Sequence, residues 1–65
     1  MRQMLIKIYY PWTETEVGQS FFVPSLDVYK TKEAGLVVAL HLYIRGKATF
    51  GLLHGKHGVL FTRLS

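Results

Sequence analysis

The order of apolar and polar residues along the first third of the chain predicts two short strands. Residues 4–10 (MLIKIYY) are mostly β-branched or aromatic, with Lys7 as their only charge, and Pro11 ends the run. After a polar loop, residues 19–23 (QSFFV) form a second apolar run that a proline also ends. We expect the two runs to pair as antiparallel strands.

Residues 36–45 fit two interpretations. Their apolar side chains alternate with the period of 2 that is typical of a strand. The flanking residues favour a helix, because Thr31 can cap its N-terminus and Gly46 falls where a glycine commonly ends a helix. We therefore predict a helix over residues 32–45. One apolar stripe of this helix would consist of Leu36, Ala39, Leu40 and Tyr43.

The C-terminal third predicts a β-hairpin. Residues 48–54 (ATFGLLH) and 59–64 (VLFTRL) read as strands around a tip at residues 55–58, which has a glycine at each end. The predicted element order is ββαββ. We expect residues 1–65 to form a single α+β domain of two layers, an antiparallel sheet with one helix on one face.

Two adjacent phenylalanines raise the question of what covers the second face of the sheet. Neighbouring residues of a strand point to opposite faces, so Phe21 and Phe22 cannot share one core. Strand parity groups Phe21 with Val23, which makes Phe21 the core member. Phe22 is predicted to lie on the second face, toward a partner.

The composition predicts that this partner includes a second copy of the chain. Of the 65 residues, 49% are hydrophobic and 14% aromatic, and none is a cysteine that could form a disulfide. A domain of this size covers only about 60% of the surface that its unfolded chain exposes. We expect a homodimer, formed through the sheet face or through an exposed strand edge.

The positive charge is concentrated in the C-terminal half. The net charge is +4, and the charges of residues 1–33 cancel. Residues 34–65 contain no acid. Their cations are Arg45, Lys47, Lys56 and Arg63. Such a basic half is typical of a surface that binds a polyanion.

The sequence contains no pattern typical of a secreted or membrane protein. Residues 1–10 lack the features of a signal peptide, and no apolar run approaches the roughly 20 residues that span a bilayer. We expect a cytoplasmic protein with no membrane association.

Two motifs resemble those of a family of small proteins common in bacteriophages and prophages. The first is PW-x4-VGxSFFVPS at residues 11–25, and the second is the basic and apolar ending GKHGVLFTRL at residues 55–64. Many members end in a more charged strand that carries a tryptophan, where this chain has Phe61 and Leu64. The resemblance implies a phage-encoded accessory protein that works in the cytoplasm of the host cell.

No pattern in the sequence supports catalysis, a cofactor or a metal. Neither Ser20 nor Ser25 lies in a GxSxG turn, and no glycine-rich phosphate loop is present. His54 and His57 are three residues apart, but no further ligands accompany them. We expect a non-catalytic protein.

Two binding functions remain. Lys7 and Tyr9 share one face of their predicted strand, as do Phe61 and Arg63 of theirs. If these faces lie on the open side of the sheet, aromatic rings and cations would alternate there, an arrangement that binds single-stranded nucleic acid. The predicted nucleic-acid-binding residues are Lys7, Tyr9, Arg45, Lys47, Lys56, Phe61 and Arg63, and the predicted interface residues are Phe22 and Phe50.

The alternative function is binding to a host protein through the same face. A second arrangement of the sheet also stays open, because Phe50 and Phe61 could instead fill the core beneath the helix. A slip of one residue in strand register exchanges the two arrangements.

Overall fold

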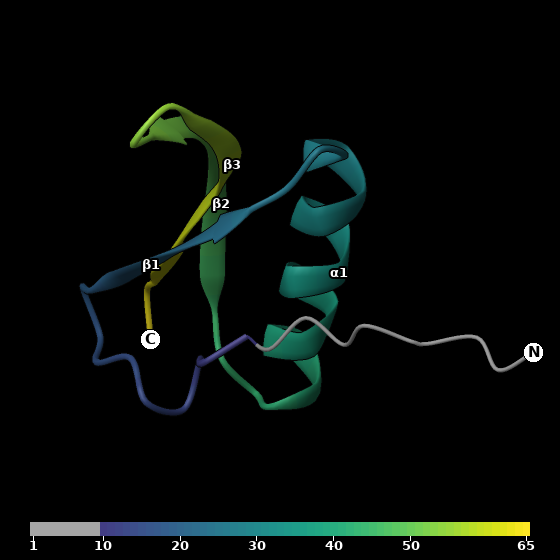
Figure 1. Ribbon diagram of the computed structural model, residues 1–65. Helices are drawn as coiled ribbons and strands as arrows, with labels where there is room; N and C mark the ends of the chain where they lie inside the picture. Colours follow the sequence, from purple (N-terminus) through teal and green to yellow (C-terminus); the bar gives the residue numbers. More distant parts are fainter. Residues whose placement is uncertain (1–9) are drawn as a thin grey trace, which may run out of the picture.

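A computed structural model of the protein describes residues 10–65. They form one helix on a three-stranded antiparallel sheet. The elements are β1 (Ser20–Pro24), α1 (Val28–His41), β2 (Gly46–Leu53) and β3 (Lys56–Arg63). The strand order is β1-β3-β2, and α1 lies on one side of the sheet (Figure 1). The predicted α+β class is confirmed. The strand predicted at residues 4–10 lies outside the described residues except for Tyr10, which is not in a strand.

The chain order of the strands differs from their order in the sheet. Both β1 and β2 run antiparallel to β3, so β1 and β2 are parallel to each other and α1 connects them. This arrangement is a split βαβ unit with β3 inserted between its two strands. The register places Phe21 opposite Phe61 and Phe22 opposite Leu60.

The predicted start of the helix is wrong by four residues, about one turn. Asp27 is the N-cap, and its carboxylate accepts a hydrogen bond from the backbone N–H of Lys30 at 3.1 Å. Thr31, the predicted cap, is buried inside the first turn, where its hydroxyl pairs with that of Ser25. Asp27 is the better cap here because its own backbone N–H also donates a hydrogen bond to the hydroxyl of Ser25.

The helix also ends earlier than predicted. Its last residue is His41, and Tyr43 then adopts a left-handed conformation with φ of 59°. Gly46, the predicted terminating glycine, is instead the first residue of β2, where it pairs with Arg63. A side chain on Gly46 would overlap the indole ring of Trp12, so packing rather than helix termination explains this glycine.

The C-terminal hairpin is confirmed, but its turn is shorter than predicted. The turn consists of His54 and Gly55, both with positive φ (52° and 77°), as the mirror-image turns of two-residue hairpins require. Gly58, predicted to be in the tip, lies within β3. A Cβ atom on Gly58 would overlap the carbonyl oxygen of Val23, so this glycine permits the close approach of β1.

The core lies between α1 and the sheet, and aromatic rings dominate it. Trp12 and Phe61 are completely buried, and Phe21 stacks on Phe61 at 5.3 Å between ring centroids. Trp12 contacts Phe21 edge to face at 5.0 Å, and its indole N–H donates to the carbonyl of Gly35 at 2.9 Å. The prediction that Phe21 is the core member of its pair is therefore confirmed.

Gly35 allows α1 to approach this core, which leads to a prediction about its replacement. A side chain at Gly35 would collide with the ring of Phe61. Gly35→Ala is expected to lower the free energy of unfolding by about 1–3 kcal/mol, because overpacking outweighs the gain of about 1 kcal/mol in helix propensity. Chemical denaturation followed by circular dichroism measures this. The control is Ala34→Gly, at the neighbouring exposed position, which measures the ordinary cost of a glycine in this helix. A Gly35→Ala variant that is more stable than the unmodified chain would contradict the steric argument.

Candidate nucleic-acid interface

The face of the sheet away from α1 is the candidate binding surface, and we refer to it as the open face. Strand register and parity determine which side chains point to it. They are Ser20, Phe22 and Pro24 of β1, Lys47, Thr49, Gly51 and Leu53 of β2, and Lys56, Gly58, Leu60 and Thr62 of β3. The described residues place no helix on this face (Figure 1).

An aromatic ring lies at the centre of the open face on a floor of two glycines. A Cβ atom on Gly58 would be 2.6 Å from a ring carbon of Phe22, and one on Gly51 would be 3.7 Å from another. The ring therefore extends from β1 across β3 toward β2. Phe22 is half-buried in this position. The prediction that Phe22 lies on the second face is confirmed.

Two lysines stand at opposite ends of the open face. Lys47 is opposite Thr62, and Lys56 is at the other end of β3, opposite Leu53. The six residue steps from Lys56 to Thr62 span roughly 20 Å of strand. Both lysines are exposed, and none of the residues of the open face is acidic.

Hydroxyl and apolar side chains fill the surface between the lysines. Ser20 and Thr62 share a hydrogen bond of 2.7 Å between their hydroxyls, and the Thr49 hydroxyl lies 3.5 Å from the carbonyl of Leu60. Leu53 and Leu60 are partly exposed beside them. Sequence reasoning missed these residues because their place on this face depends on the pairing register, although parity with Phe22 and Lys56 is the signal that links them.

Two of the predicted aromatic residues are on the opposite face. Phe61 is completely buried beneath α1, so its predicted role in nucleic-acid binding is wrong. Phe50 faces the helix side as well, where its ring contacts Tyr29 edge to face at 4.9 Å and the ammonium of Lys32 at 5.4 Å. The register pairs Phe50 with Val59, a core residue, and this settles which of the two sheet arrangements is present.

The predicted role of Arg63 in nucleic-acid binding is also not supported, because its guanidinium has structural partners. Its Nη1 donates to the carbonyls of Trp12 at 3.2 Å and Thr15 at 2.9 Å. Its Nε donates to the carbonyl of Ser65 at 3.2 Å. Arg63 thus holds the loop before β1 against the end of β3.

The remaining predicted residues divide into three groups. Lys47 and Lys56 are on the open face, as described above. Arg45 is exposed and directly precedes β2, so it extends the basic end at Lys47. Lys7 and Tyr9 lie outside the described residues. The structure therefore places Phe22, Lys47 and Lys56 on one face, with Arg45 beside its Lys47 end.

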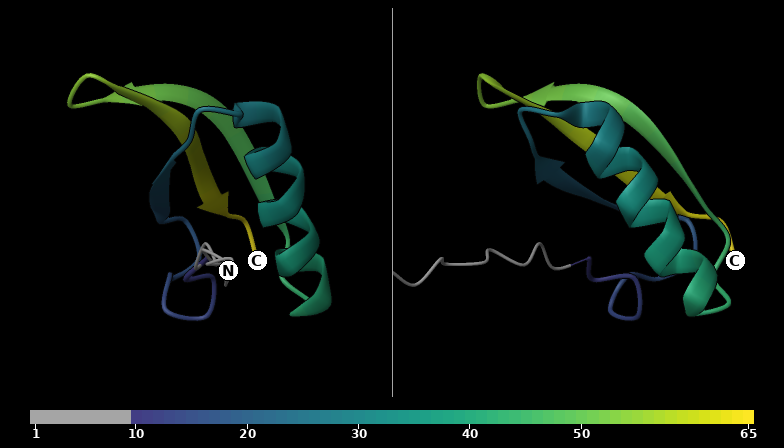
Figure 2. Two further views of the ribbon diagram at one scale, coloured as in Figure 1. Left: turned by 45° about the vertical axis from the view of Figure 1, so that its right-hand side comes forward. Right: turned by 90° about the vertical axis from the view of Figure 1, so that its right-hand side faces the viewer.

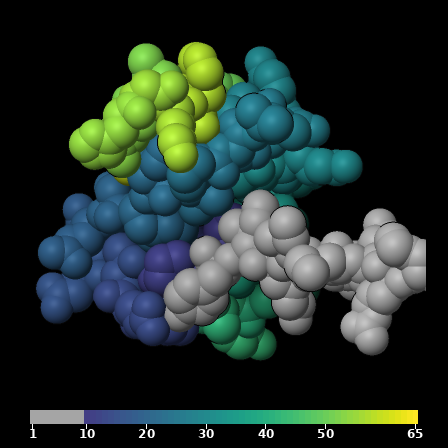
Figure 3. Space-filling model, viewed as in Figure 1, coloured from purple at the N-terminus to yellow at the C-terminus, as the bar shows by residue number. Residues whose placement is uncertain are grey.

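The hairpin tip that carries Lys56 projects from the body of the domain. In Figure 3 it forms the yellow-green lobe at the upper left, beyond the blue atoms of β1. His54 and Gly55 form its turn, and both are exposed. Lys56 is therefore accessible to a ligand that passes over the open face.

The described part of the chain shows neither a metal-binding cluster nor a membrane-spanning helix. No group of three or more His, Cys, Asp or Glu side chains in residues 10–65 could hold a metal ion. Over the same residues, no helix is long and apolar enough to cross a membrane.

Comparisons with known proteins add no further constraint. No family model matches this sequence, and neither the curated proteins nor the solved structures contain a match.

Proposed function

We propose that this chain is a small, non-catalytic accessory protein of the phage type that binds single-stranded nucleic acid through the open face. The observation that carries the proposal is the arrangement of Phe22 between Lys47 and Lys56 on a face that has no carboxylate. A base can stack on an exposed part of an aromatic ring, and lysines on either side can neutralise the phosphates that flank it.

The glycine floor explains how one ring could be accessible to a base. Gly51 and Gly58 have no side chains to rise beside Phe22, so the ring can lie low across the sheet. The hydroxyls of Ser20, Thr49 and Thr62 surround it as hydrogen-bonding groups. Contacts of this kind are tolerant of base identity, because every base has an aromatic face.

The first test is the effect of Phe22→Leu on the affinity for a fluorescently labelled oligonucleotide, measured by anisotropy. Leucine keeps the apolar cover over Gly58 but cannot stack on a base. Loss of about 1–3 kcal/mol of stacking predicts a weakening of about 5- to 150-fold. Phe50→Leu is the matched control, since Phe50 is on the other face and should leave the affinity unchanged.

The second test is the dependence of that affinity on salt. Each neutralised phosphate contributes about 0.7 to the slope of log affinity against log salt for a single strand. The double variant Lys47→Gln/Lys56→Gln should therefore reduce the slope by about 1.4. Lys30→Gln, on exposed helix surface, is the control. An affinity that does not change with salt, or a slope that this double variant leaves unaltered, would rule out the proposal.

A second candidate function is binding to a host protein, and the partly exposed Leu53 and Leu60 beside Phe22 favour it. An apolar protein interface is much less sensitive to salt than phosphate contacts are. Capture of a host protein that survives nuclease treatment and high salt, and is lost in Leu60→Ser but kept in Phe22→Leu, would support this candidate over nucleic acid.

A further inference from the structure

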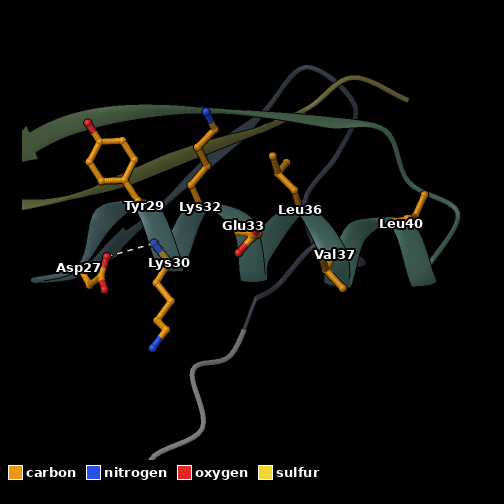
Figure 4. A pocket seen from close by; sticks show the side chains of 8 residues that line it. All are labelled: Asp27, Tyr29, Lys30, Lys32, Glu33, Leu36, Val37 and Leu40. Atoms are coloured by element: carbon orange, nitrogen blue, oxygen red, sulfur yellow. Dashed lines mark hydrogen bonds between the residues drawn. The ribbon is translucent and has the colours of Figure 1, made fainter.

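Helix α1 fully buries only small side chains against the sheet, packs Leu36 partly on the core, and leaves other large apolar side chains exposed. The buried side consists of the small residues Thr31, Gly35 and Ala39. On the outer side, Tyr29 is 73% exposed and Leu40 is 70% exposed. With Leu36 and Val37 these residues line a groove of about 730 Å³ along the helix (Figure 4). A single domain in isolation gains nothing from such a groove.

Strand β2, which lies beside this groove, has a free edge. Among residues 10–65 it pairs only with β3, and its eight residues make it longer than β1, the other edge strand of the described sheet. Its only charged residue is Lys47, and it contains no proline. Leu52 is 63% exposed and Phe50 is 47% exposed. Long apolar edges of this type pair with other strands unless charges, prolines or bulges prevent it.

The groove and the free edge form one continuous side of the molecule. Helix α1 packs mainly on β2 and β3, so its outer side is next to the β2 edge. The right-hand view of Figure 2 shows β2 running along α1, with the helix nearer the viewer. Tyr29 and Lys32 of the helix contact Phe50 of the strand, and Figure 4 shows Tyr29, Lys32 and Leu36 projecting toward β2.

We propose that a second copy of this chain covers this side, with β2 pairing antiparallel to β2 of the second copy and the two α1 helices packing through their outer sides. The resulting sheet would be continuous, with three strands from each copy. A single two-fold symmetric interface would then supply hydrogen bonds to the backbone groups of the free edge and bury the exposed apolar side chains. A different occupant would have to supply a strand and an apolar surface at once.

The charges along this side suit such self-pairing. A two-fold axis perpendicular to the sheet keeps both helices on the same side, and it requires one residue of β2 to face its own copy. The middle of Gly46–Leu53 lies between Thr49 and Phe50, so one of these two is at the axis. Lys47 then faces Gly51 or Leu53 of the second copy, never another lysine.

The helices are also complementary in charge. Lys32 and Glu33 are adjacent on the outer side of α1 and opposite in sign. In an antiparallel pair of helices, Lys32 of one copy can approach Glu33 of the other, and the two-fold axis repeats the contact. The chain thus has apolar, backbone and charged groups that match a copy of itself.

The test begins with the mass of the full-length, nuclease-treated protein, measured by light scattering at tens of micromolar. The expected mass is twice that of the chain. Tyr29→Glu should give the monomer mass, because it places a carboxylate beside Phe50, close to the two-fold axis, without disturbing the core. The matched control is Leu26→Glu, at a fully exposed position between β1 and α1, which should remain dimeric. A monomer mass for the unmodified chain would overturn the proposal.

Cysteine crosslinking tests the strand pairing itself, since the natural chain has no cysteine. Under mild oxidation, either Thr49→Cys or Phe50→Cys should form a disulfide between chains, because the residue at the axis lies within the distance that a disulfide can join. Leu26→Cys should not. A dimer that neither β2 cysteine crosslinks would overturn the strand pairing, and a dimer that Tyr29→Glu leaves intact would overturn the helix contact. These measurements contain no nucleic acid, so they stand apart from the proposed function.

Discussion

Phe61→Ala is expected to lower the free energy of unfolding by about 3–5 kcal/mol, the usual cost of removing a buried phenylalanine ring. The ring is completely buried, stacks on Phe21, and meets Tyr10 and Trp12 edge to face at 5.7 and 5.6 Å. It also lies against the backbone of Gly35, where no neighbouring side chain can move in to fill the space. Stabilities of about 5–15 kcal/mol are usual for folded proteins, so the loss would remove much of the total.

Thermal and chemical denaturation of Phe61→Ala, followed by circular dichroism, would measure this effect. Phe50→Ala is the matched control, because Phe50 faces the same side of the sheet but is about half exposed, and its loss should cost less. A Phe61→Ala variant that unfolds cooperatively near the original midpoint, yet no longer binds an oligonucleotide, would return Phe61 to a binding surface and contradict the observed register.

Trp12→Ala is expected to have an effect of similar size, about 3–5 kcal/mol. The indole ring is completely buried, packs on Gly46 of β2, and donates its N–H to the carbonyl of Gly35 of α1. It therefore joins three separate parts of the chain: the loop before β1, the helix and the sheet. Because Gly35 and Gly46 have no side chains, they cannot refill the cavity that alanine would leave.

Two further variants separate the contributions of Trp12. Trp12→Phe keeps an aromatic ring but removes the N–H that donates to Gly35, which leaves a buried carbonyl without this partner and should cost about 1–3 kcal/mol. Val17→Ala, in the same loop but exposed, should change stability little. Circular dichroism follows the variants without Trp12. Equal stabilities of Trp12→Ala and Val17→Ala would show that the loop does not contribute to the core.

The existence and type of each described element could be predicted from the sequence, and so could the division between Phe21 and Phe22. These features depend on neighbouring residues, through periodicity, prolines and the alternation of side chains along a strand. Element ends were predicted less well where two residues could do the same task. Thr31 and Asp27 are both good helix caps, and the hydrogen bonds of the Ser25 hydroxyl with Thr31 and with the backbone N–H of Asp27 decide between them.

The candidate site depended more strongly on tertiary structure. Parity alone groups Phe61 with Arg63, and this grouping is correct, since both are on the helix side of β3. What parity cannot tell is which face carries the helix. The sequence also contains no sign that the guanidinium of Arg63 would bind carbonyls of the loop near Trp12, because these partners are about 50 residues away.

The sequence by itself determined the α+β class, the helix and the C-terminal hairpin, the two-faced pair of phenylalanines and a C-terminal half without acids. Only the tertiary structure decided that Phe22, and not Phe61, is the ring on the open face between Lys47 and Lys56, and that Tyr29 and Leu40 of α1 are left exposed. The physical reason is that local patterns set the conformation of a segment, whereas strand register and the close approach at Gly35, Gly46 and Gly58 result from contacts between distant segments.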